Sequence, residues 1–250
     1  MSPKDGDYVG SLTPTLWVRP QNTPGLQVQF QACLADDEGD PVLSTCQTSQ
    51  WLAIPIWKLP AGLIPKWSQT VLWRIQVKVG STIIQEWPEE YYRFTVRVPQ
   101  PPITSHLSGA GDGAEIAGVN PQAGNYTTAA IDASVSVAGP PLATVRTYNS
   151  QDPRTDGGFG PGWSTLWDQK VVQDDDGTGN VVVTLADGRQ VRFGRNVDGS
   201  YAPPPGERLD FVLDSGTWIL RDPTGTRRLF SYPDGKLLKV IDADGREQHY

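Results

Sequence analysis

The side chains that could carry out catalysis in this 250-residue chain are few. There are two histidines, His106 and His249, and neither is accompanied by a serine or cysteine in a strained turn. Nucleophilic catalysis needs a base within hydrogen-bond reach of the nucleophile. We therefore predict that the chain is not an enzyme and that it uses no cofactor.

The strongest candidate for a cation site is the acidic run DDDGTGN at 174–180, because clustered carboxylate and amide oxygens on a glycine loop suit calcium. Asp174, Asp176 and Asn180 would supply the oxygens. An EF-hand loop also needs a distal glutamate, and this run is not followed by one. We favour the alternative, a solvated hairpin tip without metal.

The glycine-rich run GGFGPGW at 157–163 has the composition of a phosphate-binding loop. Such a loop must lead into a helix whose amides face the anion, whereas WSTLW at 163–167 begins like a strand. We therefore expect a tight crossover shaped by glycines that include Gly160 and Gly162. In this interpretation Phe159, Trp163 and Trp167 anchor the loop in the core.

Composition points to an all-β protein whose connections are dominated by turns. The chain has 26 Gly, 22 Pro and nine Trp, and it shows no apolar stripe of helical period. Its net charge of −7, with scattered Lys and Arg, argues against nucleic acid or anionic lipid as the main partner. No apolar run is long enough to span a membrane or to form an export signal.

Two cysteines, Cys33 and Cys46, flank a loop of turn-forming residues between two strand-like runs. A cross-strand disulfide is our first interpretation, and it would imply an oxidising compartment. Two buried thiols are the alternative. A zinc site is disfavoured because no histidine lies near them.

Residues 1–99 are predicted to form a small β-sandwich. Apolar and polar residues alternate at 26–32, 71–79 and 92–98, which is typical of half-buried strands. The order of these strands resembles the fibronectin type III and immunoglobulin-like modules of secreted bacterial proteins. Trp73 is expected in the core. One or two of the tryptophans near loops could be exposed and bind sugar: Trp51, Trp57, Trp67 and Trp87.

Residues 100–118 are rich in Pro and Gly and are predicted to be a linker. From 119 to 250, Asp-Gly pairs separate short alternating runs at intervals of roughly ten residues, which predicts an array of hairpins. We expect type I′ turns there, with positive φ at the central residues. The pairs are Asp187-Gly188, Asp198-Gly199, Asp234-Gly235 and Asp244-Gly245.

The tract VRTYNSQDPRTDGGFGPGWSTLWD at 145–168, with Tyr148, Asn149 and Trp163, resembles the start of the RHS/YD-repeat shell of bacterial polymorphic toxins and wall-associated proteins. The run YPDGKLLKVIDADGR at 232–246 is similar to that family's aromatic, Asp-Gly and strand pattern. The run DPTG at 222–225 resembles a fragment of the family's self-cleavage motif. Because Thr226 replaces the motif's leucine, we interpret it as an ordinary turn.

The resemblance implies a secreted or cell-surface bacterial protein in which a β-cocoon encloses a C-terminal toxin effector. The partners it implies are downstream YD repeats and that effector, with 118–168 bracing one end of the shell. The alternative is an adhesin-like module that binds a cell-surface glycan or protein through the first domain.

Overall fold

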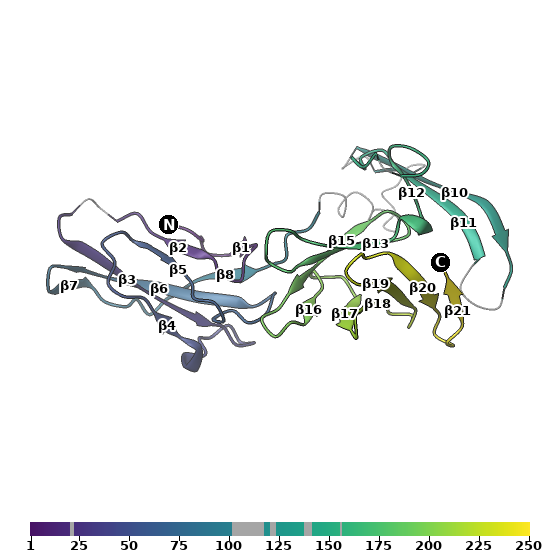
Figure 1. Ribbon diagram of the computed structural model, residues 1–250. Helices are drawn as coiled ribbons and strands as arrows, with labels where there is room; N and C mark the ends of the chain where they lie inside the picture. Colours follow the sequence, from purple (N-terminus) through teal and green to yellow (C-terminus); the bar gives the residue numbers. More distant parts are fainter. Residues whose placement is uncertain (21–22, 102–117, 121–123, 138–141, 156) are drawn as a thin grey trace. The chain divides into compact units, whose positions relative to one another are not determined.

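The computed structural model describes residues 1–20, 23–101, 118–120, 124–137, 142–155 and 157–250 (Figure 1). These residues form β-strands, turns and two short 3₁₀ segments, η1 (Leu43–Thr45) and η2 (Leu166–Asp168). The all-β prediction is confirmed. Within the described ranges, no helix has the length and apolar character needed to cross a bilayer.

The chain divides into two compact units. The first contains residues 1–98 and the short segment 196–199, and the second contains residues 99–195 and 200–250. Most of the predicted linker, residues 102–117, lies outside the described part of the chain.

The first unit contains one large sheet and one small sheet. The large sheet has the order β1-β8-β6-β3-β4 with β7 also paired to β6, and the small sheet pairs β2 with β5. β1 runs parallel to β8, and the other pairs are antiparallel. The strands are β1 (Asp7–Val9), β2 (Thr15–Trp17), β3 (Leu26–Leu34), β4 (Gln47–Thr48), β5 (Ile56–Lys58), β6 (Thr70–Val79), β7 (Thr82–Gln85) and β8 (Tyr92–Val96).

Strand β3 follows the predicted alternation. Val28, Phe30 and Ala32 are fully buried, while Gln29 and Gln31 on the other face are half-buried. Gln29 accepts a hydrogen bond from Gln76 at 2.6 Å on β6, so the polar face is also ordered.

Strand β6 departs from the single apolar face that its sequence predicts. Leu72 and Gln76, on the predicted polar face, are buried, whereas Ile75 and Val79 are only half-buried. The strand pairs with β3 on one side and with β8 and β7 on the other. Because β6 lies in the middle of the sheet, the burial of its side chains does not follow the pattern of a strand with one solvated face.

We expected that one or two of the four tryptophans near loops could be exposed, but none of them is. Trp67 is buried, and Trp51, Trp57 and Trp87 are half-buried. The Arg74 guanidinium lies 5.5 Å from the Trp87 ring centre and 4.4 Å from that of Tyr91, and the Lys78 ammonium lies 4.5 Å from Trp51. Cation–π contacts of this kind cover the indole faces.

A disulfide joins Cys33, the fully buried residue near the end of β3, to the half-buried Cys46 after η1. The bond closes a loop with a sequence separation of 13 residues. It ties the central strand β3 to the segment that leads into the edge strand β4.

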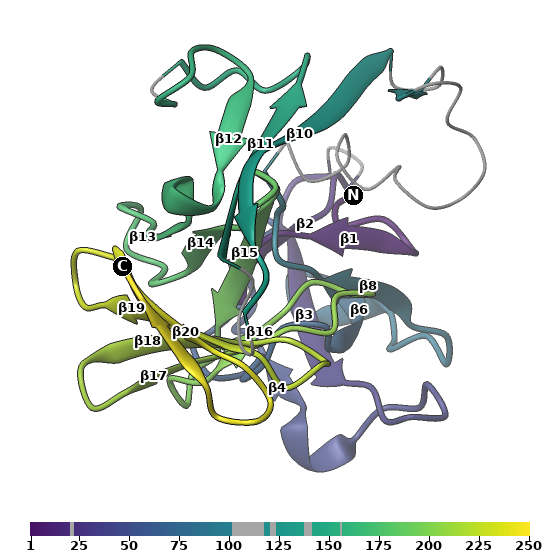
Figure 2. The same cartoon turned by 90° about the vertical axis from the view of Figure 1, so that its right-hand side faces the viewer.

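The second unit consists of antiparallel strands that pair in chain order. Figure 2 shows β17–β20 side by side in one of its three sheets. The sheet orders are β12-β11-β10-β9, β13-β14-β15-β16 and β17-β18-β19-β20-β21. The strands are β9 (Val119–Asn120), β10 (Asn125–Val135), β11 (Leu142–Asn149), β12 (Trp163–Thr165), β13 (Lys170–Gln173), β14 (Val181–Thr184), β15 (Gln190–Arg195), β16 (Tyr201–Ala202), β17 (Asp210–Asp214), β18 (Thr217–Arg221), β19 (Arg227–Ser231), β20 (Leu237–Ile241) and β21 (Glu247–His249).

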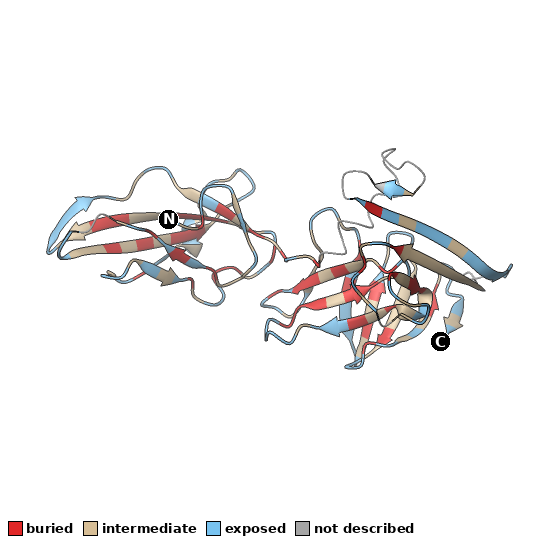
Figure 3. Cartoon of the chain, turned by 90° about the horizontal axis from the view of Figure 1, so that it is seen from above, coloured by how far each residue is buried: buried red, intermediate tan, exposed pale blue. Residues whose placement is uncertain are grey.

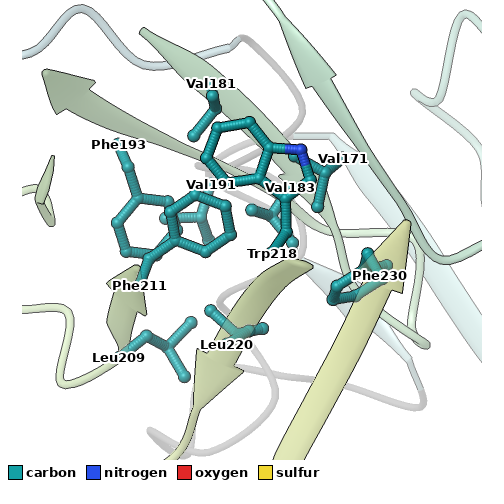
Figure 4. Packing of buried hydrophobic residues seen from close by; sticks show 10 residues of the cluster. All are labelled: Val171, Val181, Val183, Val191, Phe193, Leu209, Phe211, Trp218, Leu220 and Phe230. Carbon is teal, nitrogen blue, oxygen red and sulfur yellow. The ribbon is translucent and has the colours of Figure 1, made fainter. Parts of the chain in front are cut away.

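The last two sheets of this unit share one hydrophobic core (Figure 4). Phe193 from β15 and Phe211 from β17 stack at 5.0 Å, and Trp218 from β18 stacks on Phe211 at 5.2 Å. Figure 3 shows buried segments, in red, along several strands of this unit. The other buried members of the core are Val171, Val181, Val183, Val191, Leu209, Leu220 and Phe230.

Candidate functional site

The tract from Tyr148 to Trp163 forms an aromatic node where β11 meets β12. Tyr148 pairs with Trp163 across the two strands, and their ring centres are 5.2 Å apart. The amide of buried Asn149 donates to the Gly162 carbonyl at 2.8 Å. A Cβ on Gly162 would lie 2.7 Å from the Asn149 carbonyl oxygen, so this close approach requires glycine.

Two of the predicted aromatic anchors are not in the core. Phe159 is 50% exposed and Trp167 is 54% exposed, whereas Trp163 is half-buried. The prediction that all three anchor the loop is therefore wrong for Phe159 and Trp167. Phe159 lies between Gly158 and Gly160 in a turn without strand pairing, and it contacts the Arg146 guanidinium at 5.0 Å.

The glycine-rich loop leads into a strand, as its sequence predicts. Residues 163–165 form β12, and η2 follows directly. Thr165 caps η2, since its amide donates to the Asp168 carboxylate at 2.6 Å and its hydroxyl accepts from the Trp167 amide at 3.3 Å. This cap holds the exposed Trp167 in place.

A buried ion pair that the sequence analysis missed joins this tract to the hairpin array. The Asp152 side chain is 2% exposed and pairs with Arg154, whose side chain is 19% exposed. The Arg154 guanidinium also donates to the Gly188 carbonyl at 2.7 Å, in the β14–β15 turn. The sequence does not reveal this connection, because Arg154 and Gly188 are 34 residues apart.

The Asp-Gly pairs lie at turns, but not at the type I′ turns that we predicted. At the β14–β15 turn, the Gly188 amide donates to the Leu185 carbonyl at 2.9 Å, and Gly188 has a φ of 81°. Ser68 and Ser215 are the non-glycine residues with positive φ in the described chain, so Asp187 does not share this conformation. The geometry is a type I turn followed by a left-handed glycine.

The same geometry recurs at other turns. Gly199 and Gly245 have φ values of 84° and 85°, and their amides donate to Asn196 and Asp242, three residues earlier. The turn that contains Asp198-Gly199 groups with the first unit. A two-residue turn with positive φ at both positions does occur at Ser215-Gly216, between β17 and β18.

Each of two turns begins with an aspartate whose role the sequence analysis missed. Asp222 Oδ1 accepts hydrogen bonds from the amides of Thr224 at 3.0 Å and Thr226 at 3.1 Å. Asp242 Oδ1 accepts in the same way from Asp244 and Arg246. The pattern Asp-x-x-Gly, with Gly225 and Gly245, was the available signal. The run DPTG forms a turn, as we predicted.

We expect Asp222→Ala to lower the free energy of unfolding by about 1–2 kcal/mol, because it removes several hydrogen bonds to a charged acceptor. Burial raises the pKa of Asp222, but hydrogen bonds from Thr224 and Arg228 outweigh burial and hold the pKa below its ordinary value. The stabilisation is therefore present above an unfolded pKa of about 3.9 and is lost as the pH falls through the folded pKa.

Urea unfolding at about pH 7 and about pH 3 measures this effect, since the lower pH lies below the unfolded pKa of about 3.9, where the stabilisation begins to be lost. The difference between the native chain and Asp222→Ala should shrink at the lower pH. Asp210→Ala is the control, because Asp210 is 60% exposed and lies 3.7 Å from Arg221. Equal losses in the two variants at neutral pH would contradict the role of Asp222.

The fourth pair, Asp234-Gly235, lies in a turn that contacts another strand. The Gly235 amide donates to the Ser231 carbonyl at 2.7 Å, which closes the β19–β20 turn. The Gly235 carbonyl accepts from the Val171 amide of β13 at 2.9 Å. A Cβ on Gly235 would overlap the Val171 carbonyl oxygen. This contact joins the second and third sheets of the unit.

The calcium candidates do not form a shared site. Asp174 pairs with Arg192 at 3.1 Å, and burial raises its pKa. Asp176 accepts from the Thr178 amide and hydroxyl, which lowers its pKa. Asn180 Oδ1 accepts from the Arg195 amide at 2.9 Å. Across the described ranges, no group of three or more His, Cys, Asp or Glu side chains is arranged to hold a metal ion.

The two histidines are not brought into a catalytic arrangement by the described residues. His249 lies at the end of β21, and its Nε2 is 3.0 Å from the Glu247 carboxylate. His106 lies outside the part of the chain that the structure describes.

Comparison with known proteins finds a family match in the second half of the chain. Residues 117–193 match the family described as "Domain of unknown function (DUF6531)". This range contains the aromatic node, the ion pair of Asp152 with Arg154, and most of the sheet β13–β15.

Three curated relatives are each 33% identical to the chain over 132 residues, which is 53% of the chain and 6% of each relative. They are tRNA nuclease WapA of Bacillus subtilis (strain 168), tRNA3(Ser)-specific nuclease WapA of Bacillus spizizenii and tRNA(Glu)-specific nuclease WapA of Bacillus subtilis subsp. natto. The chain therefore spans a small fraction of their length. Together with the family match, these similarities are consistent with a toxin-related RHS-like protein.

Among solved structures, the cycloalternan-forming enzyme from Listeria monocytogenes in complex with pentasaccharide substrate aligns over 98% of this chain and 18% of that chain. The TM-score is 0.19 and the sequence identity is 10%. A likeness of this size carries no argument about fold or function.

Proposed function

We propose that this chain is a non-catalytic structural segment at the start of the β-shell of a secreted or surface RHS/YD-repeat protein. The observation that carries the proposal is the run of strands β13–β21, which pair in chain order within two sheets that have one hydrophobic core between them. The family match overlaps the first of these sheets. The shell encloses a C-terminal toxin effector.

The geometry of the last sheet supports growth of such a wall. β21 pairs with β20 on one side, and it has no second strand partner within the described chain. An unpaired edge is a template for another strand, and stacked hairpins gain stability from their neighbours. We propose that downstream YD repeats pair with this edge.

The relatives are named as tRNA nucleases, and the matched stretch covers 6% of their length. We propose that the effector of this protein, whatever its reaction, lies outside these 250 residues. The disulfide between Cys33 and Cys46 supports an oxidising destination such as the cell surface or the medium.

Limited proteolysis of the full-length polypeptide tests enclosure. We expect the C-terminal effector to resist protease in the native protein and to be cut faster when Gly235→Ala disrupts the contact between β13 and the β19–β20 turn. Gly245→Ala, at a turn with free space, is the matched control. An effector that is cut as fast in the native protein as it is in isolation would overturn the proposal.

A further inference from the structure

A hollow of about 350 Å³ in the second unit separates the β10–β11 hairpin from the sheet β17–β21 (Figure 1). Ala143, Val145 and Thr147 of β11 line it from one side, and Val240 and Tyr250 line it from the sheet. Two sheets of the same unit therefore approach each other here without filling the space between them.

The sheet side of the hollow continues the hydrophobic core. Residues directly opposite each other on neighbouring antiparallel strands have their side chains on one face. Phe211 pairs with Leu220, and Leu220 pairs with Arg228. Arg228 pairs with Val240, and Val240 pairs with Gln248 on the edge strand β21. The first two residues lie in the core, and the last three line the hollow. This row of side chains therefore runs from the core into the hollow and stops at β21.

The hairpin side of the hollow is a small, largely apolar sheet face. Ala143, Val145 and Thr147 alternate along β11, so they share one face, and all three are half-buried. Val145 lies directly opposite Ile131 of β10, which is 70% exposed. Covering these aliphatic side chains removes apolar surface from water, which is favourable. The face is suited to packing against other apolar side chains.

The charged groups that line the hollow already have partners within the unit. Arg228 pairs with Asp222 at 3.0 Å. Asp187 Oδ1 accepts a hydrogen bond from the Arg189 amide at 3.0 Å. An occupant of the hollow therefore needs no charge of its own, and apolar side chains suit it better than charged ones.

We infer that the β10–β11 hairpin packs on the core-facing side chains of the first strand that joins β21. This inference rests on the proposed function, because it requires a downstream strand at that edge. The residue opposite Gln248 extends the row of core-facing side chains into the hollow, toward Val145. The strand is therefore apolar at this position and at the positions two residues away on the same face. In this way the hairpin completes the core of the wall at its first junction.

Hydrogen exchange of the full-length polypeptide, measured by mass spectrometry, tests this inference. We expect Val145→Asp to speed exchange in the first strand after β21 at least about tenfold, because an unpaired carboxylate is costly in an apolar contact. Thr128→Asp is the matched control. Thr128 is exposed and pairs with Tyr148, so it lies on the opposite face of the same hairpin. It should leave that exchange unchanged.

Exchange at the His249 amide reports separately on the proposed function. The Tyr250 amide donates to the Leu238 carbonyl, so the His249 amide points to the free edge of β21. Slow exchange at His249 in the native polypeptide shows that a strand has joined this edge. Fast exchange there would overturn the proposed function and this inference together.

Slow exchange at His249, with native exchange of the downstream strand in Val145→Asp, would overturn this inference and leave the proposed function standing. Equal acceleration by Thr128→Asp would also overturn it. If Val145→Asp unfolds the hairpin, as exchange of the β10–β12 amides reports, Val145→Thr decides, because it keeps the shape of the side chain. Native exchange of the downstream strand in Val145→Thr then contradicts the packing, and faster exchange supports it.

Discussion

Replacing Gly235 with alanine is expected to destabilise the second unit by about 3 kcal/mol or more, from backbone strain and overpacking together. Gly235 has a φ of 68°, which alanine adopts only at a cost. The new Cβ would also overlap the Val171 carbonyl oxygen on β13. Relief of this overlap must separate two backbones and weaken the hydrogen bond from the Val171 amide to the Gly235 carbonyl.

Comparison with Gly245→Ala separates the effect of backbone strain from the effect of overpacking. Gly245 has a φ of 85°, yet no neighbouring atom lies within 4 Å of the position that a Cβ would take. Gly245→Ala should therefore lower the free energy of unfolding by only about 1–2 kcal/mol, which comes from backbone strain. Hydrogen exchange of the β13–β15 amides during urea unfolding reports on this unit specifically. Equal destabilisation by the two substitutions would show that the contact with Val171 contributes nothing.

Arg154→Met is expected to destabilise the same unit by about 3 kcal/mol, because it leaves the Asp152 carboxylate buried without its partner. The Asp152 side chain is 2% exposed, so water cannot replace the guanidinium. The substitution also removes the hydrogen bond to the Gly188 carbonyl, which connects this tract to the β14–β15 turn.

The double variant Asp152→Asn with Arg154→Met is the informative comparison. Because it removes the buried charge together with its partner, it should be more stable than Arg154→Met alone. Arg221→Met is the surface control, since Arg221 and Asp210 are both more than half exposed, at 54% and 60%. Arg221→Met is expected to lower the free energy of unfolding by less than about 1 kcal/mol. A double variant less stable than Arg154→Met would contradict this account.

Much of the fold could be predicted from the sequence, because strand alternation and turn residues are local signals. The alternation at 26–32 predicts the buried face of β3, and the Asp-Gly pairs mark turns of the hairpin array. Strand β6 was predicted less well, since its burial depends on neighbours on both sides that are distant in the sequence.

The site was harder to predict, for two physical reasons. Aromatic residues usually signal burial, but Phe159 and Trp167 lie in a turn and a 3₁₀ segment that leave them exposed. An Asp-Gly pair also fits both a type I′ hairpin turn and a type I turn followed by a left-handed glycine. The residue that distinguishes the two turns lies before the pair in the sequence. An aspartate three positions before the glycine, as at Asp222 and Asp242, favours the type I turn, because its carboxylate accepts the turn amides.

The central claim, that these strands begin a continuous shell, is tested most directly by electron cryo-microscopy of the full-length polypeptide. We predict that a strand from a downstream repeat pairs with the free edge of β21, so that the sheet β17–β21 continues into a curved wall around the effector. A structure in which that edge stays unpaired, or in which the effector lies outside any β-wall, would contradict the claim.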